Sequence, residues 1–151
     1  MKSKILLLSA AVALSFSFAP PKKHTPIRLN GTWQLITGTT ITKGVSVITD
    51  YTKTSRFIKI INGTHFAFLK HDLNAPKDSS NHFDAGGGSY TLKGNQYTEH
   101  LDYYSDKNWE NKAFNFTVTL KGDTLIQKGL EKVENENIDR IIIEKYLKIG
   151  N

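Results

Sequence analysis

Residues 89–104, with the sequence SYTLKGNQYTEHLDYY, contain the pattern that decides the fold of this chain. Two runs of alternating apolar and polar side chains are joined there by Gly94-Asn95. Alternation with a period of two is typical of a β-strand with one buried face, and a two-residue turn containing glycine joins such strands into a hairpin. The stretch therefore predicts two antiparallel strands, over residues 89–93 and 96–104.

The same hairpin pattern occurs twice more, around Asn62-Gly63 and around Gly122-Asp123. At Asn62-Gly63 we expect a type I′ turn, because both of its central residues need positive φ angles, which Asn and Gly tolerate best. Three tight hairpins in one short chain predict an up-and-down meander. The predicted strands cover residues 31–37, 45–51, 56–61, 64–69, 89–93, 96–104, 114–121, 124–128 and 138–149.

Helical patterns are scarce between these strands. Residues 72–83 are rich in turn formers and predict a loop, residues 105–112 predict one helical turn or a wide loop, and residues 131–137 predict a polar connection. A sheet with no helix to cover it leaves unpaired edges unless it closes on itself. The expected fold class is therefore all-β, an antiparallel up-and-down barrel of about 8–10 strands with few or no helices.

The first residues predict export. Lys2 and Lys4 precede an apolar run over residues 5–18, and a polar segment comes after it. This layout is typical of a secretory signal, and the run is shorter than the about 20 residues that cross a bilayer. We assign residues 1–19 to a signal peptide, with cleavage after Ala19 or after Ser15, and an uncleaved anchor as a lesser alternative. The location predicted for the remaining chain is periplasmic or extracellular, with no transmembrane span.

Length and composition limit the organisation of the remaining chain. Residues 20–28 are expected to form a disordered leader, and residues 29–151 a single barrel domain, because a chain of this length has no room for a second core. The chain has no cysteine, which excludes both disulfides and a lipid-modified cysteine. Its net charge of +6 owes much to lysines near the amino terminus, and elsewhere basic and acidic residues alternate. No clustered basic face is expected, so nucleic acid is not an expected partner.

A resemblance to a known family supports the barrel. Gly31-Thr32-Trp33 at the start of the first strand resembles the G-x-W motif of the lipocalin and fatty-acid-binding superfamily. More broadly, the chain resembles small exported bacterial lipocalin-like domains of unassigned function over residues 29–149. The segments that carry this likeness are residues 31–35, 64–68, 87–99 and 143–149.

In such domains a basic side chain on the last strand lies over the first-strand tryptophan. The resemblance therefore implies a barrel base built from Gly31, Trp33 and Lys148. The last strand of this chain carries Tyr146 and Lys148 where the family often has Trp and Arg. Either Lys148 or Arg140 is left as the cation over Trp33, and such a contact contributes roughly 0.5–2 kcal/mol.

Alternation also predicts which side chains face the interior. Along residues 96–104 we expect Tyr97, Glu99, Leu101 and Tyr103 to point inward, since this set is the more apolar one. A barrel of this size can hold one small ligand among apolar walls with a few polar groups. The expected ligand-binding residues are Phe66, Phe68, Tyr90, Tyr97, Glu99, Leu101, Tyr103, Phe114 and Phe116.

Glu99 is the most unusual of these residues. A carboxyl group among leucine and tyrosines either has its pKa raised by desolvation or needs a cationic or phenolic partner. It could bind a ligand's hydroxyl or amine, accept a proton, or make a structural hydrogen bond. The histidines lack the spacing of a zinc motif, so neither a metal nor a cofactor is expected. Three successive glycines, residues 86–88, predict a bulge or a tight corner at the start of a strand.

These observations predict a protein that holds a small apolar or amphipathic molecule in its barrel. An alternative is a filled barrel that binds other proteins or surfaces, or acts as an inhibitor, through the loops at residues 72–83 and 105–112, with Trp109 exposed. A third hypothesis is an acid–base enzyme that uses Glu99 with a tyrosine. No catalytic motif supports the third hypothesis.

Overall fold

The computed structural model of this chain describes residues 26–73 and 83–150. The predicted signal peptide, the leader up to residue 25 and residues 74–82 of the predicted loop lie outside the described residues. Leu29, at the start of the predicted domain, is buried, and Ile27 packs against the same core. Within this part of the chain, the elements are β1 (Gly31–Thr42), β2 (Val45–Asp50), α1 (Tyr51–Thr54), β3 (Ser55–Ile61), β4 (His65–Asp72), β5 (Phe83–Lys93), β6 (Gln96–Tyr104), β7 (Lys112–Lys121), β8 (Thr124–Val133), a 3-10 turn (Glu134–Glu136) and β9 (Ile138–Ile149).

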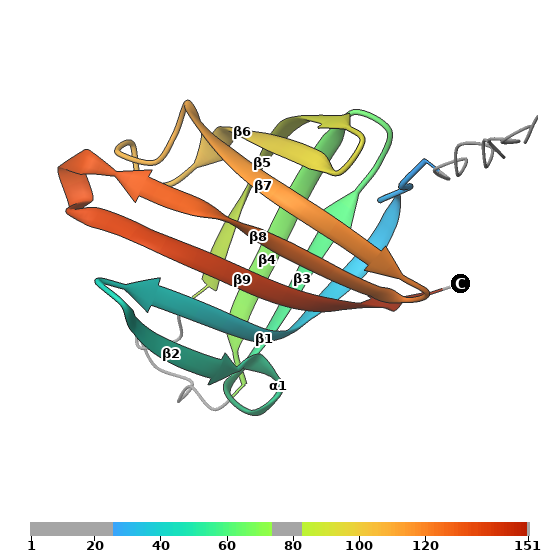
Figure 1. The fold of residues 1–151 in the computed structure, drawn as a ribbon, viewed down its shortest axis with the longest axis horizontal. Coiled ribbons are helices and arrows are strands. Elements are labelled where there is room, and N and C mark those ends of the chain that lie inside the picture. The colour runs from blue at the N-terminus through green and yellow to red at the C-terminus, as the bar shows by residue number, and fades with distance from the viewer. Residues whose placement is uncertain (1–25, 74–82, 151) are drawn as a thin grey trace, which may run out of the picture.

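The strands form one antiparallel sheet that closes into a barrel. The order is β2-β1-β3-β4-β5-β6-β7-β8-β9, and β1 pairs again with β9 to complete the ring (Figure 1). Eight strands make the closed barrel, and α1 is a single short helix at its edge. The predicted all-β lipocalin-like barrel is therefore confirmed.

β2 is the strand that does not belong to the ring. The first half of β1 pairs with β3, and its second half pairs with β2. The hairpin between β1 and β2 turns at Lys43 and Gly44, whose φ angles are 50° and 82°. The first strand was predicted to end at residue 37, and it continues to residue 42 because Lys43-Gly44 forms a hairpin turn that the pattern of the sequence does not single out.

The three predicted hairpins are present as β3–β4, β5–β6 and β7–β8. Gly94 and Gly122 have positive φ angles of 62° and 54°, which suits the first position of a tight turn. The expected type I′ turn at Asn62-Gly63 is wrong. There the Asn62 side chain accepts hydrogen bonds from the backbone N–H groups of Thr64 and His65 at 2.9 and 2.8 Å, which holds a wider loop.

A bulge interrupts the pairing of β5 with β6. Gly87 lies opposite Tyr103 and Gly88 opposite Leu101, so Asp102 is an extra residue on β6. A Cβ on Gly88 would collide with the carbonyl oxygen of His100, which explains why glycine occupies this position. The predicted bulge is therefore confirmed, and it reverses which side chains of β6 face inward beyond Leu101.

One end of the barrel is filled by side chains. Trp33 is 1% exposed, and its indole Nε1 donates a hydrogen bond of 2.7 Å to the carbonyl oxygen of Leu29. Both ends of the described chain lie at this side of the molecule (Figure 1). The buried apolar cluster is Leu29, Trp33, Leu35, Ile61, Phe66, Tyr97, Leu101, Phe114, Phe116, Val118, Leu125, Val133 and Tyr146.

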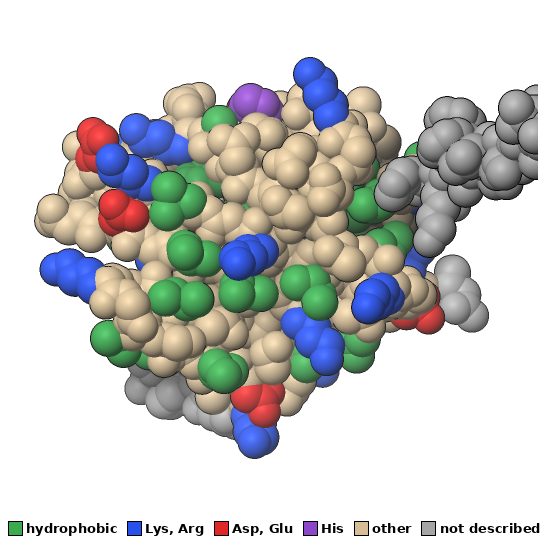
Figure 2. Space-filling model, in the orientation of Figure 1, with side chains coloured by type: hydrophobic (Ala, Val, Ile, Leu, Met, Phe, Trp, Pro, Cys, Tyr) green, Lys and Arg blue, Asp and Glu red, His purple; other side chains and the backbone are tan. Residues whose placement is uncertain are grey.

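The outer face of β8 and β9 carries apolar side chains between lysines. Figure 2 shows this face, where hydrophobic side chains lie between basic ones. Leu130 and Leu147 are 53% and 40% exposed there. Single exposed apolar residues are normal on soluble surfaces. Among residues 26–73 and 83–150, no helix has the length and apolarity that a bilayer crossing requires.

Candidate functional site

The barrel contains a cavity of about 290 Å³ toward the end opposite Trp33. Tyr51 of α1, Trp109 of the β6–β7 connection and Arg140 near the start of β9 all line it, so it lies on the side where these elements meet. Its volume is at the lower limit of the about 300–1,000 Å³ that is usual for ligand pockets. The cavity therefore suits a molecule of one or two rings better than a long lipid.

An aromatic girdle covers part of the cavity wall. Neighbouring rings in it have centroids 5.9–6.3 Å apart, in tilted or edge-on arrangements. These distances are typical of favourable aromatic pairs. The girdle runs in the order Tyr51, Phe57, Phe68, Tyr104, Trp109 and Phe114, and all six line the cavity.

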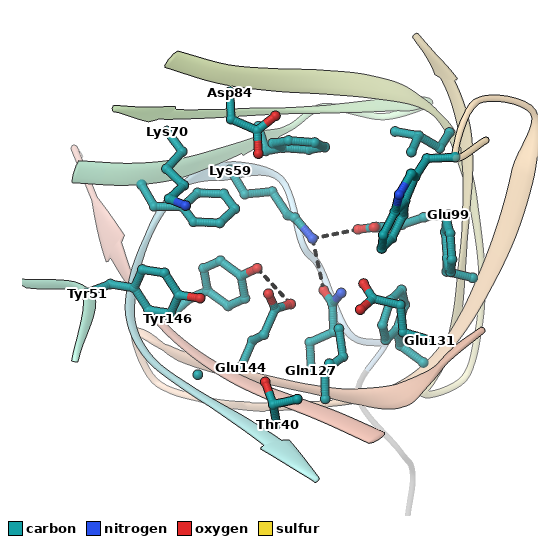
Figure 3. A pocket seen from close by; sticks show the side chains of 18 of the residues that line it. Thr40, Tyr51, Lys59, Lys70, Asp84, Glu99, Gln127, Glu131, Glu144 and Tyr146 are labelled. Carbon is teal, nitrogen blue, oxygen red and sulfur yellow. Dashed lines mark hydrogen bonds and ion pairs between the residues drawn. The ribbon is translucent and has the colours of Figure 1, made fainter. Parts of the chain in front are cut away.

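The centre of the cavity wall is a buried ion pair. The Lys59 Nζ lies 2.7 Å from the Glu99 Oε1 and 3.2 Å from the Gln127 Oε1 (Figure 3). The residues are 3%, 7% and 1% exposed. Buried charges of this kind are tolerated when they are paired and hydrogen-bonded. Glu99 thus has a cationic partner, one of the two solutions expected for a carboxyl group in this setting.

Two further carboxylates point into the cavity from β8 and β9. Glu131 accepts hydrogen bonds from the Arg140 guanidinium. Glu144 accepts a hydrogen bond of 2.9 Å from the Tyr146 hydroxyl. Burial raises the pKa of Glu131, and the Arg140 charge opposes that shift. Burial also raises the pKa of Glu144, against the attraction of Lys59.

The tyrosines around these carboxylates are held in the neutral form. Burial, and then the charge of Glu144, raise the pKa of Tyr146 well above its ordinary value. Burial, and then the charge of Asp84, raise the pKa of Tyr104 to about 12. At neutral pH both phenols are hydrogen-bond donors rather than phenolates.

The structure brings most of the predicted ligand-binding residues to the barrel interior, but not all to the cavity. Phe68, Glu99, Leu101, Phe114 and Phe116 line it. In contrast, Phe66 and Tyr97 are buried outside that lining, in the filled part of the barrel. Tyr90 stacks against Tyr97 with a centroid distance of 5.2 Å, and its hydroxyl donates to the Asn62 carbonyl oxygen at 2.7 Å.

Two placements from the sequence are wrong. Tyr103 is 70% exposed and points outward, whereas Tyr104 lines the cavity, because the bulge at Asp102 reverses the alternation. Trp109 was expected to be an exposed anchor on a loop. Instead it is half-buried, lines the cavity and packs against Phe114 with a centroid distance of 5.9 Å.

The three residues predicted for the base of the barrel, Gly31, Trp33 and Lys148, lie together in the structure. The Lys148 Nζ lies 5.5 Å from the centroid of the Trp33 ring. A Cβ on Gly31 would lie 2.7 Å from the Lys148 Cε, so the glycine leaves room for this side chain. Arg140 is near the other end of β9, where it binds Glu131, so of the two candidate cations Lys148 is the one over Trp33.

Most of the charged wall was not predicted from the sequence, although part of it has a recognisable pattern. Lys59 alternates with Phe57 and Ile61, which placed a lysine on the apolar face of its strand. Gln127 alternates with Leu125 in the same way. The inward face of β9 is ambiguous in the sequence because its three successive isoleucines hide the alternation. The missed polar lining residues are Thr39, Thr40, Tyr51, Lys59, Lys70, Asp84, Gln127, Glu131, Arg140, Glu144 and Tyr146.

The described part of the chain contains no group of three His, Cys, Asp or Glu side chains arranged to hold a metal ion. The cavity wall instead offers aromatic faces, a carboxylate and amide and hydroxyl groups. Such a wall can bind a small organic molecule through stacking and hydrogen bonds.

Comparisons with known proteins support the fold. The barrel is similar to the crystal structure of a lipocalin-like protein from Bacteroides uniformis ATCC 8492, with a TM-score of 0.50 and 19% identity, over 80% of this chain and 98% of that one. A mutant of the fluorescent protein UnaG matches less well, with a TM-score of 0.38 and 10% identity, over 82% of this chain and 97% of that one. No family model and no curated protein matches the sequence. The chain therefore has a lipocalin-like fold, and its function has to be argued from the cavity.

Proposed function

We propose that this protein is exported and holds a small amphipathic molecule in its barrel. The observation that carries the proposal is the cavity of about 290 Å³, walled by aromatic rings on one side and by polar and charged side chains on the other. Lipocalin-like barrels commonly bind small hydrophobic ligands, and this fold supplies the same kind of interior. The export part rests on the basic and apolar residues at the start of the chain.

The alternative, a filled barrel that acts through its loops, has less support. It depended on Trp109 as an exposed residue, and Trp109 belongs to the cavity wall. It also depended on an interior without space. An acid–base reaction at Glu99 has less support too, because this carboxylate is bound to Lys59 at 2.7 Å.

The first test is native mass spectrometry of the purified protein before and after organic extraction. We expect a discrete extra mass that extraction removes. A second test adds prodan, an uncharged fluorescent probe with two fused rings, to the extracted protein. Its emission should rise on binding.

A pair of phenylalanine variants makes the second test specific. Phe68→Ala removes a ring from the cavity wall, whereas Phe83→Ala removes a ring that is 68% exposed outside the cavity. We expect the first variant to weaken probe binding by about tenfold and the second to leave it unchanged. The absence of an extractable mass, together with equal probe binding by the two variants, would count against a binding barrel.

A further inference from the structure

The charges in the cavity wall do not cancel. The wall has one more acidic side chain than basic ones. An excess buried charge is costly unless something compensates it. The acidic residues are Asp84, Glu99, Glu131 and Glu144, and the basic residues are Lys59, Lys70 and Arg140.

Two of the carboxylates already have a basic partner. The Lys59 Nζ lies 2.7 Å from the Glu99 Oε1, and the Arg140 guanidinium donates to Glu131. Both pairs are formed without a ligand. They therefore need no further cation, although the charge of Lys59 also acts on Glu144, where it opposes the rise in pKa that burial causes.

The remaining carboxylates differ from each other. Asp84 lies directly across the β4–β5 ladder from Lys70, so its cross-strand neighbour is a basic residue. Glu144 lies across the β1–β9 ladder from Gly38, which has no side chain that could pair with the carboxylate. Its Oε2 accepts from the Tyr146 hydroxyl at 2.9 Å. Within residues 26–73 and 83–150, its Oε1 has no hydrogen bond and neither oxygen has a basic group within 4.0 Å.

The neighbouring strand adds a buried donor to the cavity wall. Gln127 is 1% exposed and pairs with Glu144 across the β8–β9 ladder. Lys59 donates to the Gln127 Oε1 at 3.2 Å, which fixes the amide orientation because Nε2 cannot accept from an ammonium group. In the described part of the chain, the Gln127 Nε2 has no acceptor, and the side chain lines the cavity (Figure 3).

The aromatic girdle favours the same class of ligand. Ring faces attract cations, and tryptophan attracts them most strongly. Trp109, Tyr104 and Phe114 form consecutive members of the girdle, with centroids 6.3 and 5.9 Å apart. A cavity with π-faces and a carboxylate that forms no ion pair is an environment that stabilises an organic cation.

We propose that the cavity selects a small protonated amine on a flat apolar body, with its N–H groups donating to Glu144 and its body against the aromatic girdle. This inference rests on the proposed binding function and names the ligand class. The Gln127 Nε2 is then free to donate to an oxygen of the same ligand. The cavity volume of about 290 Å³ restricts the body to one or two rings.

The test uses three probes that share one ring and a short chain but differ in the head group. These are 2-phenylethylamine, 2-phenylethanol and 3-phenylpropanoate, which are cationic, neutral and anionic at about pH 8. Binding to the extracted protein is measured by isothermal titration calorimetry. We expect the amine to bind at least about tenfold more tightly than the alcohol, and the propanoate to bind most weakly. Equal affinity for amine and alcohol, or no measurable binding of the amine, overturns the inference.

A matched pair of variants locates the cation. Glu144→Gln keeps an oxygen that can accept from Tyr146, and it should remove the preference for the amine. Glu134→Gln changes the same charge at a side chain that is 81% exposed on the 3-10 turn, and it should keep the preference. If both variants keep the preference, Glu144 is not the binding group. If Glu144→Gln does not fold, the head-group series on the unaltered protein still decides the inference.

Failure of this inference can be told apart from failure of the binding function. Prodan carries no charge and tests only whether the cavity accepts an apolar molecule. Binding of that probe without an amine preference overturns the ligand class and leaves the binding barrel standing. If the protein binds neither the uncharged probe nor the amine and carries no extractable mass, the binding function and the ligand class are both overturned.

Discussion

The two halves of the barrel interior are built from the same strands but differ in chemistry. Around Trp33 the interior is apolar and filled, with Leu125 and Val118 at 0% and 1% exposure. Toward the other end the same strands place Lys59 and Gln127 on the inward face. The filled half supplies the burial that stabilises the fold. The other half contributes less to stability, because it contains a cavity and charged side chains.

The largest expected effect tests the filled half. Trp33→Ala removes a buried ring, its hydrogen bond to Leu29 and its contact with Lys148. We expect a loss of about 3–5 kcal/mol in the free energy of unfolding, which is typical of large-to-small core substitutions. Chemical denaturation followed by circular dichroism measures it.

Trp109→Ala is the matched substitution in the other half. This side chain is half-buried at the cavity wall, so its removal enlarges a space that already exists. We expect a clearly smaller loss than for Trp33→Ala. Equal losses at the two positions would mean that the cavity half contributes as much stability as the filled half, contrary to the comparison.

The next effect concerns the ion pair in the middle of the barrel. Lys59→Met leaves the buried Glu99 carboxylate without its partner, and breaking such a pair costs about 3–5 kcal/mol. Lys59→Met combined with Glu99→Leu removes both charges. We expect the double variant to recover most of the lost stability.

A double-mutant cycle over the two positions gives the coupling energy directly. Glu99→Leu alone completes the cycle, because it leaves Lys59 with only the Gln127 oxygen as a hydrogen-bond partner among the described residues. If the double variant is as unstable as Lys59→Met alone, the loss comes from packing around Lys59 rather than from the unpaired carboxylate.

Prediction from sequence succeeded along the first part of β6 and failed beyond its bulge for a physical reason. The alternation of Tyr97, Glu99 and Leu101 gave the inward face of β6 because strands with one buried face follow a period of two. The same rule failed at Tyr103, since one extra residue at the bulge reverses every side chain beyond it.

The charged wall was harder to predict than the apolar core. A pattern of apolar residues identifies a core face, but Glu131 and Arg140 resemble solvent-facing residues until their strands are paired. Their proximity depends on the register of β8 with β9. Lys59 and Glu99 are 40 residues apart, so only the closed barrel brings them together.

The bulge between β5 and β6 gives a third prediction. In Gly88→Ala a Cβ meets the His100 carbonyl oxygen and the backbone N of Asp102, so β5 and β6 must separate locally. We expect a loss of about 1–3 kcal/mol, as for other overpacked sites. The change should also disturb Tyr104, which shares this part of the ladder, and weaken binding of prodan.

Gly63→Ala is the control for the bulge. A Cβ there meets nothing within 4 Å, and the φ angle of Gly63 is not positive. We expect a change within about 0.5 kcal/mol, as for most surface substitutions. A Gly88→Ala protein as stable as the Gly63→Ala protein would show that the bulge tolerates a side chain.

The smallest expected effect concerns Glu144 and depends on pH. Burial raises the pKa of this carboxyl above its ordinary value of 4.5 in the folded protein. The folded state therefore binds the proton more tightly than the unfolded chain does. Tighter proton binding stabilises the folded state fully below about pH 4.5. This stabilisation is lost as the pH rises through the raised pKa of the folded protein.

Glu144→Gln removes this dependence because an amide does not ionise. Its oxygen can still accept from Tyr146, so the hydrogen bond is kept. We expect the variant to gain stability over the unaltered protein at about pH 8, by less than any loss described above, and the gain should shrink as the pH falls toward about 4.5. Denaturation midpoints of both proteins across this range measure the difference. Glu134→Gln, exposed on the 3-10 turn, should show no such trend. A difference that stays constant with pH would mean that Glu144 gives up its proton as easily inside the barrel as outside it, and the two halves would then differ in packing but not in electrostatic cost.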